Sequence, residues 1–264
     1  MDISKKTIIK HLKQLKINSN DHILFYSKLS SFFFIKKNFA KCFLSILIKY
    51  ITPRGTIIMP SYTFEDKNFV FDIKEIKSNY STGILVKEFF KKRVVRSKRL
   101  IHSHIGLGKK SGILKKKIDP TISLGANSDF DILTKNNFKC IFLGCNPDEA
   151  GTFLIHLEYL NKVPYRKKII ISKKILEKNI VKIVKVNYFD RPKNLKYDFN
   201  AAFKKLNKFG AKIYRAELRF GSSFSLTLKD FLKYGNIMFK KNKYALIKNG
   251  NGYKFALIKF FFIN

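Results

Sequence analysis

Two residues that could exchange a proton with a substrate lie close together between Gly151 and Arg166. His156 and Glu158 are separated by one residue in the stretch GTFLIHLEYLNKVPYR. Imidazole and carboxylate groups are common general bases. The stretch is expected to be a helix, in which residues two apart point about 200° away from each other. In a regular helix the two side chains therefore cannot line one pocket.

Two further histidines lie in IHSHIG at 101–106. Because side chains two residues apart share a side of an extended segment, His102 and His104 should face the same way. They could bind a metal or make hydrogen bonds in a site. No third metal ligand is evident nearby in the sequence, so we predict no metal site.

The glycines of GLGKKSG (106–112) suggest a phosphate-binding loop at first sight. The stretch lacks both the GxxxxGK[ST] and the GxGxxG spacing that place backbone N–H groups around phosphates. We interpret these glycines as loop residues.

The chain carries 54 basic and 18 acidic residues, a formal net charge of +36. Such an excess favours a polyanionic partner such as nucleic acid or an anionic membrane surface. Only eight of the basic residues are arginine, the side chain preferred for bidentate contacts with bases and phosphates. Lysine spread over the chain indicates a compositional bias instead, so we do not expect a nucleic acid partner. The densest segment, 87–117, has twelve basic residues against one acid and would suit a phosphorylated ligand.

The elements that must position these residues alternate between strands and helices. Buried strands are expected at 22–30, 56–60 and 140–144, which are short apolar runs with serine, proline or glycine at their ends. Helical spacing of apolar residues predicts helices at 5–15, 40–51, 83–92 and 152–161. We predict an α/β fold whose central, mostly parallel sheet has helices on both faces, plus a C-terminal α+β elaboration. Ligands in such sheets bind beyond the carboxyl ends of the strands, here SKLSS, PSYTF and GCNPDEAGTF.

Beyond Arg166 the pattern changes. The alternating stretch from Lys167 to Phe189 predicts a β-hairpin, and a helix is expected over 198–210. Short strands and a helix near 226–234 should follow. With neither a repeat nor a linker evident, we predict one domain over 1–264, with a motif-bearing core at about 20–170 and an elaboration at about 171–264.

No apolar run reaches the ~18 residues that a membrane helix needs. The N-terminal segment is charged and amphipathic rather than a signal peptide. Three widely spaced cysteines do not make a disulfide framework. These features predict a cytoplasmic protein without a membrane span.

The order of several segments resembles the aminoglycoside 3-N-acetyltransferase family over about residues 20–170. The resemblance begins at HILFYSKLSS and continues through RGTIIMPSYTF, FDI at 71–73 and STGIL at 81–85. It then includes VRSKRLIHS at 95–103, LGANSDFDIL at 124–133, CIFLG, TFLIHLEY and VPYR.

The resemblance implies acetyl transfer from acetyl-CoA, as co-substrate, to an amine of an amino sugar or an aminoglycoside-like acceptor. It places His156 and Glu158 in the catalytic helix, with His156 as proton acceptor and Glu158 as the base or its orienting group. The residues that it places beside the CoA arm are Ser27, Leu29, Ser30, Ser31, Arg96, Ser97, His102, Ser103 and Thr152. The charge disfavours a polycationic acceptor and favours an anionic or neutral carrier of the amino sugar.

Several residues depart from the family pattern. The family's histidine lies three residues after the threonine, where this chain has Ile155. Tyr26, Lys28 and Leu100 also replace usual residues. A π-bulge could realign His156 with Glu158, or Glu158 could work alone on a regular helix. The third possibility is a catalytically degenerate member that acts as a basic polyanion-binding protein.

Overall fold

In the computed structural model the described residues are 5–32, 38–52, 54–63, 70–72, 82–116, 119–192 and 195–248. Phe64, Ile73, Ser81 and Lys117, which belong to segments discussed above, lie outside them. The main sheet has seven strands in the order β4-β5-β2-β1-β6-β10-β9. Their bounds are β1 His22–Ser27, β2 Thr56–Pro60, β4 Val95–Arg96, β5 His104–Gly108, β6 Lys139–Leu143, β9 Tyr214–Leu218 and β10 Gly221–Thr227.

The centre of this sheet is parallel, since β1 pairs in parallel with both β2 and β6. The outer strands β5, β4, β10 and β9 are antiparallel to their neighbours. The C-terminal elaboration therefore contributes two strands to the main sheet. Strand β1 is buried over four consecutive residues, as expected for a strand covered on both faces.

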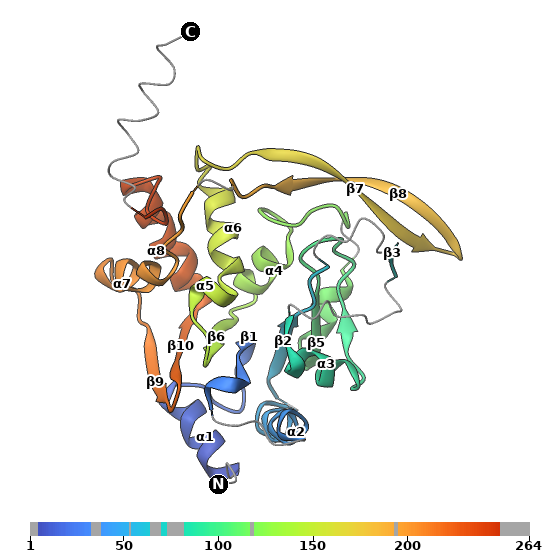
Figure 1. The fold of residues 1–264 in the computed structure, drawn as a ribbon. Helices are drawn as coiled ribbons and strands as arrows, with labels where there is room; N and C mark the ends of the chain where they lie inside the picture. The colour runs from blue at the N-terminus through green and yellow to red at the C-terminus, as the bar shows by residue number, and fades with distance from the viewer. Residues whose placement is uncertain are drawn as a thin grey trace.

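Helices cover both faces of the sheet, as predicted (Figure 1). One face packs against α1, α2 and α3 through a cluster that includes Leu12, Phe43 and Phe89. The other packs against α4, α6, α7 and α8 through Phe130, Phe153 and Phe231. The bounds are α1 Lys5–Gln14, α2 Phe39–Ile51, α3 Ile84–Phe90, α4 Asp129–Lys135, α5 Pro147–Ala150, α6 Thr152–Leu160, α7 Asn200–Lys208 and α8 Leu228–Lys241. Short 3-10 turns are η1 Leu29–Ser31 and η3 Ser111–Lys115.

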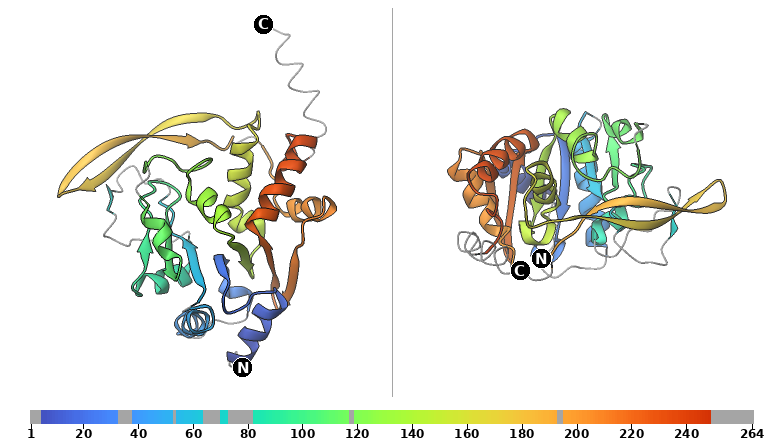
Figure 2. Two further views of the ribbon diagram at one scale, coloured as in Figure 1. Left: turned by 180° about the vertical axis from the view of Figure 1, so that it is seen from behind. Right: turned by 90° about the horizontal axis from the view of Figure 1, so that it is seen from above.

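A second sheet contains three strands in the order β3-β7-β8, namely β3 Val70–Phe71, β7 Lys168–Glu177 and β8 Ile180–Phe189. The predicted hairpin is confirmed: β7 and β8 pair over their full length around a two-residue turn. Lys178 and Asn179 have φ values of 50° and 66°, which match the twist of a hairpin. The hairpin arches along the side of the molecule opposite α1, and its tip extends beyond the body (Figures 1 and 2).

The expectation that the 106–112 glycines are loop residues is wrong for two of them, which lie in β5. A side chain at Gly106 would lie 2.4 Å from the Ile58 side chain. Gly108 has a φ of +115°, and a Cβ there would lie 2.4 Å from the Gly55 carbonyl oxygen. These two glycines allow β5 to pack closely on β2.

No helix in the described ranges is both long and apolar enough to cross a bilayer.

Candidate active site

The topology gathers the predicted polar segments at one edge of the main sheet. The parallel strands β1, β2 and β6 end at this edge, and the antiparallel strand β5 begins there. The edge therefore combines residues 27–31, 61–63, 101–104 and 144–152. This is the edge at which open α/β sheets bind ligands.

A cavity of about 160 Å³ lies beside this edge. One wall is the loop 119–124, a second is Tyr159 of α6, and a third is the base of the β7–β8 hairpin. The lining residues are Ile101, His102, Asp119, Thr121, Ile122, Ser123, Leu124, Tyr159, Lys168, Asn187, Tyr188 and Phe189. Tyr159 contacts two of its neighbours, with the Lys168 Nζ 4.7 Å and the Phe189 ring 5.4 Å from its ring centroid. Typical small-molecule sites have about 300–1,000 Å³, so a cavity of about 160 Å³ suits the reacting part of a ligand rather than a whole one.

His102 brings a titratable ring to the cavity wall. Its Nδ1 pairs with the Ser123 Oγ, and its ring meets the Tyr62 ring edge-on at 5.1 Å. Burial, followed by repulsion from His104, lowers the pKa of His102 to about 3. The imidazole is therefore neutral near pH 7, with one donor and one acceptor nitrogen. His104 also meets Tyr62 edge-on, which confirms that the two histidines face the same way.

A buried carboxylate lies behind this wall. Asp129, 2% exposed, accepts hydrogen bonds from Ser97 Oγ at 2.5 Å and Arg99 Nε at 2.9 Å. Its Oδ2 also lies 2.9 Å from His104 Nδ1. Burial acts to raise the pKa of Asp129, but the contacts with His104, Arg99 and Ser97 outweigh burial and leave that pKa below its usual value. Arg99 also donates to the carbonyl oxygens of Asp119 and Asn127, so the cluster links the 97–104 segment to the opposite cavity wall.

The predicted residues Arg96, Ser97 and Ser103 are buried and bonded within the protein. Arg96 Nη2 donates to the Ser61 carbonyl oxygen and to Ser103 Oγ at 3.4 Å, and its guanidinium lies 4.7 Å from the Phe71 ring centroid. Ser103 Oγ donates to the Ser61 carbonyl oxygen at 2.6 Å. These contacts fix the segment that carries His102. Burial lowers the pKa of Arg96 to about 10, which leaves it charged at neutral pH.

The predicted residues after β1 divide into two groups. Leu29 packs in the core below the sheet, and Ser31 Oγ donates to the Gly144 carbonyl oxygen at 2.5 Å. Ser27 is half-buried and Ser30 is exposed, so these two are available to a ligand at the edge. Lys28 is 52% exposed and forms an ion pair with Glu149. Thr152 begins α6 at the same edge and is half-buried.

Helix α6 is a regular α-helix from Thr152 to Leu160, which excludes a π-bulge between Thr152 and His156. His156 is 1% exposed and packs against the Phe130 and Phe153 rings at 5.4 and 5.3 Å. Its Nδ1 accepts a hydrogen bond from the Gly125 N–H at 3.2 Å. Burial lowers the pKa of His156 to about 4, so the ring is neutral. Ile155, at the family's histidine position, is half-buried.

Glu158 is fully buried on another side of α6. Its Oε2 forms an ion pair with Arg166 Nε at 2.7 Å, and its Oε1 accepts a hydrogen bond from the Tyr165 hydroxyl at 2.6 Å. Burial raises the pKa of Glu158 against the opposing effects of Arg166 and Tyr165. Arg166 in turn donates to the Phe189 carbonyl oxygen at 3.3 Å.

The structure does not bring His156 and Glu158 together, but both support the walls of the cavity. His156 contacts the loop that contributes Ser123 and Leu124. Glu158 contacts Arg166, which is bonded to Phe189 at the hairpin base. Tyr159, beside Glu158 in the sequence, lines the cavity itself.

Sequence reasoning missed Asp129, Tyr62, Ser123 and Tyr159. A signal for Asp129 was present, because a serine followed three residues later by an acid marks a helix start. The Ser128 side chain accepts the Asp131 N–H and places Asp129 in the first turn of α4. The other residues carry no local signal.

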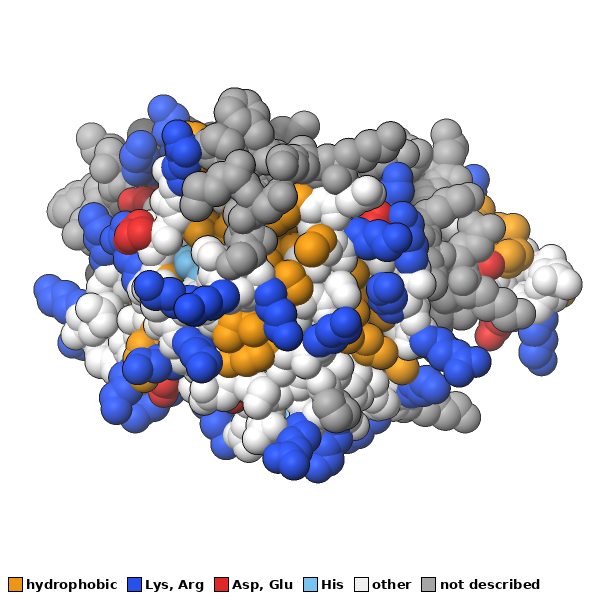
Figure 3. All heavy atoms as spheres, turned by 90° about the horizontal axis from the view of Figure 1, so that it is seen from below, with side chains coloured by type: hydrophobic (Ala, Val, Ile, Leu, Met, Phe, Trp, Pro, Cys, Tyr) orange, Lys and Arg blue, Asp and Glu red, His pale blue; other side chains and the backbone are white. Residues whose placement is uncertain are grey.

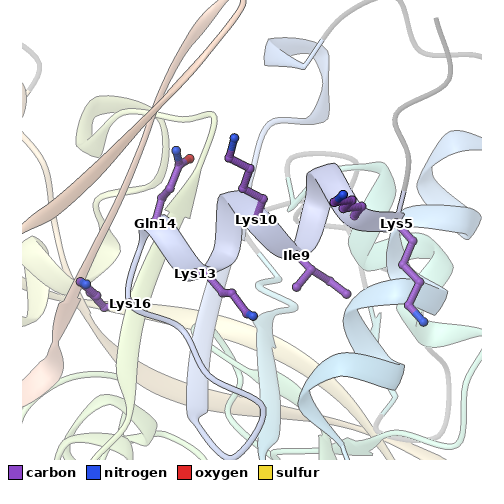
Figure 4. Close-up of a pocket in the computed structure, with 7 residues that line it drawn as sticks. Lys5, Ile9, Lys10, Lys13, Gln14 and Lys16 are labelled. Atoms are coloured by element: carbon purple, nitrogen blue, oxygen red, sulfur yellow. The ribbon is translucent and has the colours of Figure 1, made fainter.

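Basic side chains are also numerous away from this edge (Figure 3). The face seen in Figure 3 carries lysine and arginine side chains scattered among apolar ones. On α1, a shallow surface of lysines that includes Lys5, Lys10 and Lys13 lies on the opposite side of the molecule from the hairpin (Figures 1 and 4). In the 87–117 segment, Arg96 and Arg99 are buried and serve the fold.

One comparison with known proteins identifies the family of this chain. A family model described as aminoglycoside 3-N-acetyltransferase matches residues 24–239. A comparison with curated proteins gave no match.

Several solved structures have a similar fold. The YokD protein from Bacillus subtilis is 19% identical, with a TM-score of 0.75 over 90% of this chain and 99% of that one. Aminoglycoside acetyltransferase AAC(3)-IVa, in complex with a gentamicin, is 19% identical, with a TM-score of 0.78 over 94% of this chain and 92% of that one. AAC-IIIb, a binary complex with CoASH, is 16% identical, with a TM-score of 0.75 over 90% of this chain and 96% of that one. At these identities the likeness demonstrates the fold, and the predicted fold class is confirmed.

Proposed function

Because the chain belongs to the aminoglycoside 3-N-acetyltransferase family, we propose that it acetylates the amine of an amino sugar at the cavity beside His102. The family makes it a CoA-dependent N-acyltransferase with acetyl-CoA as co-substrate. The main support for this acceptor site is the open cavity between the 119–124 loop and the hairpin base. It lies at the edge of the main sheet where the parallel strands end.

The reaction needs an unprotonated amine next to a thioester. The amine nitrogen attacks the acetyl carbonyl carbon, the C–N bond forms and the C–S bond breaks, and CoA leaves as a thiol. In the tautomer in which Nδ1–H of His102 donates to Ser123, Nε2 is the basic nitrogen and accepts the proton that the amine loses. The ring must be neutral for this role, because a protonated imidazole cannot accept a proton. With a pKa of about 3 it is too weak a base to deprotonate an ammonium group, so the amine must enter unprotonated and passes its remaining proton to Nε2 as the C–N bond forms.

The CoA side of the reaction is proposed to lie along the same edge. Ser27, Ser30 and Thr152 present polar groups that are not fully buried, and the exposed ammonium of Lys28 can exchange Glu149 for a CoA phosphate. We propose that the buried residues beneath this surface hold its backbone in place, namely Arg96, Ser97 and Ser103. The loop after β1 is held in the same way by Leu29 and Ser31. His156 and Glu158 are proposed as positioning residues of the two cavity walls.

The cavity charge supports an acceptor that is neutral or anionic apart from the reacting amine. Among the described lining residues, Asp119 supplies a carboxylate and Lys168 an ammonium. A site for a polycation would need several carboxylates to offset the charge of the ligand. An amino sugar linked to a nucleotide or another anionic carrier fits this balance. The reaction is proposed to take place in the cytoplasm. The thiols of Cys140 and Cys145 are free, as is usual in a reducing compartment.

A thiol-release assay tests the proposed reaction directly. The purified full chain with acetyl-CoA should release CoA in the presence of amino sugars. It should release none above the rate of hydrolysis with their N-acetylated counterparts. The nucleotide-linked amino sugar should be preferred over gentamicin. Acetyl-CoA binding without thiol release for any amine in the panel would instead favour a catalytically degenerate protein.

A further inference from the structure

The outer face of the β7–β8 hairpin carries the two most exposed large apolar side chains of the described residues. The exposed fractions are 69% for Ile170, 70% for Ile183 and 53% for Val181. The pairing register places Ile170 opposite Asn187, Lys174 opposite Ile183 and Leu176 opposite Val181, so all six lie on one face. Isolated exposed apolar residues are ordinary, but a row on one face marks an interaction surface.

The opposite face of the hairpin is committed to the body of the protein. Val186 packs with Phe71, Leu100 and Ile101, and Lys173 Nζ donates to the Thr63 carbonyl oxygen at 3.1 Å. A slip of one residue would exchange the two faces. The inner contacts therefore fix Ile170, Ile183 and Val181 on the outside.

The same outer face is basic. Lys174 and Lys185 are exposed and alternate with the apolar residues, and Lys168 lies at the inner end of the face. Of the six lysines over residues 168–189, Lys168, Lys174 and Lys185 lie on this face, and the one acid, Glu177, lies on the opposite face, where it pairs with Lys182 near the tip. Ile180 at the turn is 60% exposed, so the protruding tip also carries apolar surface.

We propose that the outer face of the β7–β8 hairpin docks on an anionic lipid bilayer. Its aliphatic side chains would enter the interface between headgroups and acyl chains, and its lysines would contact anionic headgroups. A nucleic acid is a poorer match, because single strands stack on exposed aromatic rings and Phe189, on this face, is buried. A second copy of the chain would bring the same lysines against each other.

Vesicle sedimentation with the full chain tests this proposal. The protein should sediment with vesicles of phosphatidylcholine mixed with phosphatidylglycerol, and not with phosphatidylcholine alone. Ile170→Ser with Ile183→Ser should reduce the partition coefficient by about tenfold or more, because each loses exposed aliphatic surface. Ile84→Ser with Phe220→Ser is the matched control, since these residues are 53% and 57% exposed elsewhere. This control should bind as the wild type does.

The lysines are tested separately. Lys174→Gln with Lys185→Gln should reduce binding by about tenfold, whereas Lys10→Gln with Lys13→Gln on α1 removes equal charge and should change binding little. Equal losses in the two pairs would mean general charge attraction and would overturn the proposal. So would absence of binding to anionic vesicles at low salt. A vesicle-free dimer that dissociates in the Ile170→Ser, Ile183→Ser variant would identify a second copy as the occupant instead.

Discussion

Asp129→Asn should lower the free energy of unfolding by about 3 kcal/mol, because it leaves Arg99 buried without a counter-charge. The Arg99 side chain is 4% exposed and the Asp129 side chain 2%. The carboxylate also bonds Ser97 and His104, and an amide cannot accept from all three donors. In a chain of this size the loss corresponds to a decrease in melting temperature of about 5–10 °C.

The control for this experiment is Asp131→Asn, two residues later in the same helix. Asp131 forms an exposed pair with Lys135 at 2.8 Å and accepts the Asn127 N–H. Asp131→Asn should lower the free energy of unfolding by less than about 1 kcal/mol, as is usual when a surface ion pair is removed. Thermal and urea unfolding of both variants provide the measurement. Equal losses of stability would show that the buried cluster does not organise the wall behind His102.

His102→Gln should reduce kcat for acetyl transfer by about 100-fold or more, the usual contribution of a positioned general base. Glutamine retains a polar side chain of similar length but cannot accept a proton from the amine. The KM for acetyl-CoA should change much less, since the exposed CoA-side residues remain. His22→Gln is the control, because His22 is a half-buried histidine at the start of β1, bonded to Thr56 at 3.1 Å and outside the cavity. An unchanged kcat in His102→Gln would remove His102 from the reaction.

The pH profile of the wild type gives a second readout for His102. Burial lowers its pKa to about 3, so the imidazole stays neutral throughout the range from about pH 5 to about pH 8. The activity should rise with pH only as the substrate ammonium loses its proton. An additional inflection near the ordinary histidine pKa of about 6.5 would contradict this environment for His102.

Local patterns sufficed for much of the fold. The α6 and β7–β8 predictions depended on periodicity within one segment, and both elements formed as expected. The opposed directions of His156 and Glu158 also followed from helix geometry alone. The ordered segments that resemble the family were enough to identify it, and the match over residues 24–239 confirms that identification.

The site itself depends on contacts between distant segments. Arg99 is 30 residues from Asp129, and the cavity combines walls from four parts of the chain. Such a combination has no signature in any one segment. The same limitation applies to the hairpin: alternation predicted its strands, but the contacts with Phe71, Leu100 and Ile101 decide which face is exposed.

The most direct test of the acceptor site is to fill the cavity from its open side. Asn187 lines the cavity, whereas Lys185 lies two residues away on the same strand face and does not. Asn187→Trp should reduce kcat/KM for a soluble amino sugar by about 100-fold or more. The indole ring would occupy the cavity and keep the amine away from the thioester carbonyl carbon. Acetyl-CoA binding should persist, and Lys185→Trp should behave as the wild type. Full acetyl transfer by Asn187→Trp would contradict the assignment of this cavity to the acceptor.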